Sequence, residues 1–134
     1  DYFDEIYASR ILEHIDINFD KLMNELIRVT KPNGIIKIQV PHFSSSYSYI
    51  PTHIRSFSYM GFLKEEERNN LEMGFLRNVN IKMKIIFEKR LLLFYNYFME
   101  FIINKWKFPL HYERTCLHNL FPANYIDIEL EVVK

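Results

Sequence analysis

The chain has 134 residues, of which 49% are apolar, so it is long enough and apolar enough to form one folded domain. Lys plus Arg and Asp plus Glu number 17 each, and this zero net charge argues against a nucleic-acid binder that works by neutralising phosphates. The only cysteine, Cys116, excludes an internal disulfide and any multi-cysteine metal site. We therefore expect a reduced, cytoplasmic location and no nucleic-acid partner.

A strand–helix–strand unit is predicted over the first part of the chain. Residues 3–8 form a short apolar run typical of a buried strand. Residues 19–30 show the i, i+3, i+4, i+7 apolar spacing of an amphipathic helix, with Asn18 as its N-cap. The sequence Lys31-Pro32-Asn33-Gly34 should end this helix before a second strand at 35–41. Such a unit implies parallel strands in an α/β sheet, whose ligands bind at the carboxyl ends of the strands.

Candidate functional residues follow the second strand, in a long loop rich in Ser, Tyr and His. His53 is the candidate general base, because an imidazole can take a proton near neutral pH, and His42 is a further candidate. Arg55 could bind a carboxylate or phosphate of the acceptor. The alternative is that these are ordinary hydrogen-bonding loop residues. The histidines show no recognised ligand spacing, so no metal site is predicted.

Two later segments, 79–88 and 125–133, alternate between apolar and polar residues, which predicts strands with one solvent-exposed face. The first carries Lys82 and Lys84 on that face, and the second carries a row of acids. Opposite charges directly across a sheet are mildly stabilising. The two strands are therefore predicted to be antiparallel neighbours.

Residues 90–108 predict a strongly apolar helix, within a helical insertion at about 90–120. Its polar residues fall on one narrow stripe, namely Asn96, Glu100, Asn104 and Lys107. These interruptions argue against a transmembrane span. Burial of the apolar face inside the chain is the first interpretation, and contact with a partner or a membrane surface is the alternative.

The motifs FDEIYASRILEHI and RVTKPNGIIKIQVP, at this spacing, resemble the second half of a class I S-adenosylmethionine-dependent methyltransferase of the type 11 kind. In that family a strand ending near LEH precedes a helix ending in R-V-L-K-P-G-G and a strand ending in V-P. Asn33 here replaces the first usual glycine, and asparagine tolerates a positive φ better than most residues. Residues 51–58 and the ending FPANYIDIELEVVK also resemble a subgroup found among bacterial and archaeal sugar or cell-surface modifying genes.

The resemblance implies a partial Rossmann-like methyltransferase sheet over residues 1–134, with the equivalents of strands 4 to 7, the last two antiparallel. The family's N-terminal strands and glycine-rich cofactor loop would be missing, since none of the three glycines lies in a G-x-G-x-x-G-like context. The residues implied to face S-adenosylmethionine follow the first strand, and they are Ser9, Leu12, Glu13 and His14. The alternative is that Leu12 is a core residue and its two neighbours cap the turn.

The function implied is methyl transfer to a small-molecule or glycan acceptor, performed by a complete domain of which this chain is a piece. The piece alone is expected to be inactive. The alternative is a non-catalytic binding or assembly module. It would pair with a partner chain, or with a second copy, through the open edge at Phe3–Ala8 or the helix at 90–108. Membrane-surface contact by that helix is a third and less favoured expectation.

Overall fold

The computed structural model describes residues 1–63, 79–88, 94–105 and 108–133. Its centre is a four-stranded sheet in the order β1-β2-β4-β3. β1 and β2 are parallel, and β4 is antiparallel to both of its neighbours. The strand bounds are β1 Phe3–Ser9, β2 Thr30–Pro41, β3 Val79–Ile86 and β4 Tyr125–Val132. The predicted strands and the antiparallel pairing of the last two are confirmed.

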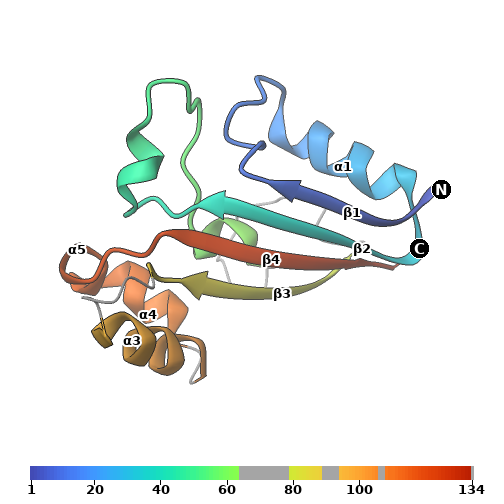
Figure 1. Cartoon of the computed structure of the whole chain (residues 1–134). Coiled ribbons are helices and arrows are strands. Elements are labelled where there is room, and N and C mark those ends of the chain that lie inside the picture. The colour runs from blue at the N-terminus through green and yellow to red at the C-terminus, as the bar shows by residue number, and fades with distance from the viewer. Residues whose placement is uncertain (64–78, 89–93, 106–107, 134) are drawn as a thin grey trace.

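Helix α1 (Phe19–Val29) connects β1 to β2 and lies over one face of the sheet (Figure 1). Its N-cap is the predicted one, because Asn18 Oδ1 accepts from the Lys21 backbone N–H at 3.0 Å. β2 begins earlier than predicted, directly after the helix at Thr30. The predicted turn is instead an irregularity inside β2, where the register with β1 shifts and Asn33 adopts a φ of 61°.

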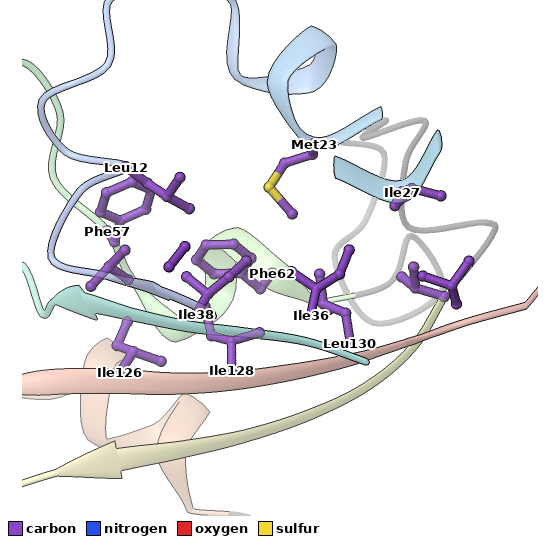
Figure 2. Packing of buried hydrophobic residues seen from close by; sticks show 14 residues of the cluster. Leu12, Met23, Ile27, Ile36, Ile38, Phe57, Phe62, Ile126, Ile128 and Leu130 are labelled. Atoms are coloured by element: carbon purple, nitrogen blue, oxygen red, sulfur yellow. The ribbon is translucent and has the colours of Figure 1, made fainter. Parts of the chain in front are cut away.

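The main core lies between α1 and the sheet, as Figure 2 shows. Met23 and Ile27 of the helix are buried against strand residues of the same face. Those strand residues include Ile36, Ile38, Ile126, Ile128 and Leu130. Leu12 from the turn after β1 and Phe57 from the loop after β2 complete one end of this cluster. The core thus fixes both loops at the carboxyl ends of the parallel strands.

The opposite face of the sheet carries polar side chains in rows that cross all four strands. One row is Tyr7, Lys37, Glu129 and Lys82, and the next is Ser9, Gln39, Asp127 and Lys84. Lys82 Nζ lies 3.4 Å from Glu129 Oε1. The prediction that the lysines of β3 lie opposite the acidic residues of β4 is therefore confirmed. Lys37 Nζ lies 2.6 Å from the Glu5 carboxylate, and this hydrogen bond raises the pKa of Lys37.

Three helices gather beside the carboxyl end of β3 (Figure 1). They are α3 (Phe94–Lys105), α4 (Pro109–Arg114) and α5 (Leu117–Leu120). A second apolar cluster of Ile85, Phe87, Ile103, Tyr112 and Ala123 lies among these elements. None of the described helices has the length and apolar character that crossing a membrane requires.

Helix α3 is oriented opposite to the first sequence interpretation, because its polar stripe packs inward. The Asn104 side chain accepts from Ile85 N–H at 2.9 Å and donates to Ile85 C=O at 2.8 Å. Glu100 accepts from Phe87 N–H at 3.1 Å, and Asn96 donates to the Glu88 carbonyl at 2.8 Å. Asn104 thus satisfies both backbone groups of Ile85 near the end of β3, and the other two side chains bind the two residues that follow this strand. Lys107, the last member of the predicted stripe, lies outside the described residues.

The apolar face of α3 consequently points outward. Its exposed aromatic residues are Phe94, Tyr95, Tyr97, Phe98 and Phe101, and Phe98 keeps 65% of its surface exposed. Lys105 Nζ lies 4.8 Å from the centre of the Phe101 ring, a cation–π arrangement. Burial of this face within the chain is not seen in the described residues.

Candidate functional site

The turn after β1 and the loop after β2 meet at the carboxyl ends of the parallel strands (Figure 1). His14 of the turn and His53 of the loop are in edge-to-face contact, with ring centres 4.5 Å apart. Glu13 lies beside them and is only 1% exposed. Leu12 is buried in the core, which agrees with the structural alternative for that residue. Three of the sequence-predicted site residues therefore come together.

Main-chain hydrogen bonds hold the two segments against each other. Ile54 N–H donates to the Glu13 carbonyl at 2.9 Å, and His14 Nδ1 lies 3.2 Å from the Thr52 carbonyl oxygen. A carbonyl oxygen can only accept, so Nδ1 of His14 carries the hydrogen in this contact. In the neutral ring Nε2 then keeps a free lone pair.

Arg55, which was predicted to bind the acceptor, contacts the chain itself. Its Nη2 donates to the carbonyls of Ile15 and Ile17 at 2.7 and 2.9 Å, and its guanidinium lies over the Phe19 ring. Its Nη1 is buried and has no hydrogen-bond partner among the described residues. The Nη2 group is therefore committed to positioning the turn after β1.

Ser9 and Arg10 form the start of the turn. The Ser9 hydroxyl donates to Gln39 Oε1 at 3.3 Å, and Arg10 N–H donates to the Gln39 carbonyl at 2.8 Å. Arg10 adopts a φ of 52°, a left-handed conformation that costs a non-glycine residue about 1–2 kcal/mol. Strain of this kind is concentrated at functional sites. The chain thus turns sharply where β1 ends.

His42 belongs to a separate, fully buried group. Its Nε2 lies 3.0 Å from Glu113 Oε1, and its Nδ1 accepts from the Ser44 backbone N–H at 3.1 Å. The Glu113 carboxylate also accepts from the N–H groups of Tyr59 and Met60, in the short 3-10 helix Tyr59–Phe62. His42 therefore joins the end of β2 to α4, with no exposed surface for an acceptor.

The sequence did not indicate Glu113 as the partner of His42. It lies 71 residues from His42 in the chain, and no local pattern pairs them. A second 3-10 helix, Ser46–Tyr49, follows His42 and is tied to it by a hydrogen bond from the Ser48 hydroxyl to the His42 carbonyl.

A hollow of about 440 Å³ lies over the polar face of the sheet, away from the His14–His53 contact. Its lining includes Tyr7, Lys37, Lys82 and Lys84. These side chains belong to the paired rows across the strands, so we attribute no chemistry to this hollow. The carboxyl-end cluster is the better candidate site, because ligands of parallel sheets bind there.

Comparison with known proteins finds no matching family model and no matching curated protein. Among solved structures, the chain is similar to an S-adenosylmethionine-dependent methyltransferase from Archaeoglobus fulgidus, with a TM-score of 0.55 and 19% identity over 97% of this chain. It is also similar to phosphoethanolamine N-methyltransferase 2 from Haemonchus contortus, with a TM-score of 0.50 and 14% identity over 98% of this chain. The chain spans 59% and 33% of the lengths of these two proteins. The described sheet therefore has the fold of the class I S-adenosylmethionine-dependent methyltransferases.

Proposed function

We propose that the domain to which this chain contributes transfers a methyl group from S-adenosylmethionine to a small-molecule or glycan acceptor. The observation that carries the proposal is the meeting of the LEH turn with the loop after β2. It occurs at the carboxyl ends of the parallel strands, in a sheet of methyltransferase fold. A pocket at this place would hold cofactor and acceptor together, and bringing reactants together is the main contribution a methyl-transfer site makes.

The residues present fit one side of the cofactor only. Ser9 to His14 form a sharp turn at the end of β1, which would be one wall of the site. No glycine-rich loop accompanies it, because Gly34 lies within β2, Gly61 lies in the 3-10 helix Tyr59–Phe62 and Gly74 lies outside the described residues. We therefore expect the 134 residues alone to bind S-adenosylmethionine weakly or not at all.

The cofactor supplies an electrophilic methyl group, and this chain would position the acceptor and receive its proton. His53 is the proposed base for an acceptor hydroxyl, since its ring lies against His14 at the edge of the loop. Arg55 and His42 are proposed to position that loop, because their polar atoms bind the turn and α4 instead of open space.

Calorimetric titration tests the cofactor half of this proposal. The 134-residue chain should give no saturable heat with S-adenosylmethionine. The chain together with the proposed remainder of the domain, whether on the same polypeptide or on a second one (the full product), should give one site. Tight, stoichiometric binding to the 134 residues would overturn the view that the chain is one wall of the site. Absence of binding to the full product would overturn the function itself.

A substitution of His53 tests the part of the proposal that concerns the acceptor. In the full product, His53→Gln should lower kcat by about 10²–10⁴ with little change in cofactor affinity, which is the usual contribution of a general base. The exposed His111 on α4 provides the control, and His111→Gln should leave kcat unchanged. Equal rates for His53→Gln and the natural chain would remove His53 from the reaction.

The second candidate is an assembly module, and one observation favours it. The two edges of the sheet differ. On β3, Asn104 of α3 binds both backbone groups of Ile85, while β1 has neither a strand nor such a side-chain contact beside it among the described residues. Phe3 and Tyr7 of β1 are 53% and 67% exposed. The occupant we propose for this edge is β1 of a second copy of the chain.

Light scattering distinguishes the two candidates. The module predicts a dimer that Tyr7→Lys dissociates, because an edge lysine opposes strand addition, together with no cofactor binding by the full product. A monomer at high micromolar concentration would contradict it. Co-sedimentation with anionic liposomes that is lost in Phe98→Glu would instead assign the outward face of α3 to a membrane surface.

A further inference from the structure

Glu13, His14 and His53 place three potential metal ligands at one point. One carboxylate oxygen and one nitrogen from each ring all lie within 4.8 Å of one another. Ligand atoms of a tetrahedral ion with bonds of 2.0–2.2 Å are about 3.4 Å apart. The described arrangement therefore needs at most about 1.4 Å of closure between its ligand atoms.

Unpaired polar atoms supply independent support. Glu13 is 1% exposed, and its Oε2 has no hydrogen-bond partner among the described residues. His53 Nδ1 is likewise buried without a partner there. A buried carboxylate oxygen without a partner is costly, because its charge has left water with no compensation. A bound cation would remove this cost for both groups at once.

The orientation of His14 also suits a ligand. Its Nδ1–H is directed to the Thr52 carbonyl, which leaves Nε2 with a lone pair. Metal-ligating histidines almost always donate their second ring N–H to a carbonyl or carboxylate, and this contact fixes the ring. The Ile54 N–H bond to the Glu13 carbonyl holds the two ligand segments in place.

We propose that Glu13, His14 and His53 bind one divalent transition-metal ion of the Zn²⁺ type. Two imidazoles and one carboxylate form a borderline-soft donor set, which suits Zn²⁺ and its transition-metal neighbours better than Mg²⁺. Three protein ligands leave a coordination position open, as in catalytic zinc sites. The sequence spacing did not indicate this site, because its ligands come from two loops that only the fold brings together.

This inference adds a metal ion to the proposed methyl-transfer site. It rests on the proposed function only for the chemical identity of the acceptor. An acceptor hydroxyl in the open position would become more acidic, so the ion would replace His53 as the means of removing its proton. Metal binding itself needs neither cofactor nor acceptor. Its failure and the failure of methyl transfer can therefore be observed separately.

Zinc titration of the metal-stripped chain tests the proposal. One Zn²⁺ should bind per chain, and proton release should accompany binding below pH 7 because His ligands must be neutral. Glu13→Gln, His14→Ala and His53→Ala should each weaken binding at least tenfold, whereas the exposed control His111→Ala should not change it. Binding that survives in His14→Ala and His53→Ala would overturn the proposal, as would no binding at all.

X-ray absorption of the Zn²⁺-loaded natural chain provides a second measurement that needs no variant. Two imidazole nitrogens and one carboxylate oxygen should lie at 2.0–2.2 Å, which are usual zinc–ligand distances. A spectrum with fewer than two imidazoles would contradict the assignment, even if the variants failed to fold.

Discussion

In most amphipathic helices, replacing an apolar residue destabilises the fold more than replacing a polar one. We expect the reverse for two substitutions on opposite faces of α3. Asn104→Leu removes the side chain that pairs with both backbone groups of Ile85, a residue with 0% exposure. Each of the two buried groups left unpaired costs about 1–3 kcal/mol, so the total loss is about 2–6 kcal/mol. The better helix propensity of leucine returns only about 0.5 kcal/mol. Phe98→Glu should cost less than about 1 kcal/mol, because Phe98 is 65% exposed.

Urea unfolding followed by circular dichroism measures both free energies. At about 3 °C per kcal/mol for a chain of this size, Asn104→Leu should also lower Tm by about 6–18 °C. Asn80→Leu is the matched control, because Asn80 is an exposed asparagine of β3. If Phe98→Glu destabilises the chain more than Asn104→Leu, the apolar face of α3 is the packed one and our account of the helix is wrong.

Three further substitutions test other parts of the structure. Gly34→Ala should cost about 1–3 kcal/mol in urea unfolding, because its Cβ would lie 2.9 and 3.0 Å from two backbone carbonyl oxygens; an unchanged midpoint would contradict this close packing. Glu113→Ala should cost about 3–5 kcal/mol, since it leaves His42 and two backbone N–H groups buried without their partner; a loss below 1 kcal/mol would argue against the buried pair. Burial raises the pKa of Tyr112 to about 12. The unfolded chain loses this proton near pH 10, so stability should be full below pH 10 and fall toward pH 12. Tyr112→Phe should flatten that fall, and an unaltered pH profile would show that another group causes it.

The strands were predictable because their patterns are local. Alternating residues located β3 and β4, and the charges of Lys82 and Glu129 identified the two strands as neighbours. The left-handed φ of Asn33 also followed from its residue type. These features depend on the period of a strand and on backbone sterics, both of which a short stretch of sequence contains.

The orientation of α3 was not predictable from periodicity. The 3.6-residue pattern located a polar stripe, and the usual rule places such a stripe in water. The outer edge of β3 offers backbone groups that need partners, and satisfying them outweighs burial of the aromatic face in the described structure. That competition involves residues about 19 positions apart, so no helical pattern contains it.

The candidate site was predicted residue by residue but not as an arrangement. His14 and His53 were each placed at the carboxyl ends of the strands, and their contact arises from the loop docking on the turn. Arg55 was predicted to face an acceptor because it is a cation in a loop. The two carbonyls that it binds become available only when residues 15–17 adopt their folded turn.

The contact between Asn104 and the edge of β3 bears on how copies of this chain can associate. If two β1 edges pair around a twofold axis, the same patch is used on both copies and the contact is isologous. The combined sheet would then end at β3 on both sides, where the Asn104 side chain occupies both backbone groups of Ile85. A further strand could pair with Ile85 only if Asn104 moved away, so this contact would oppose strand addition at that end of β3.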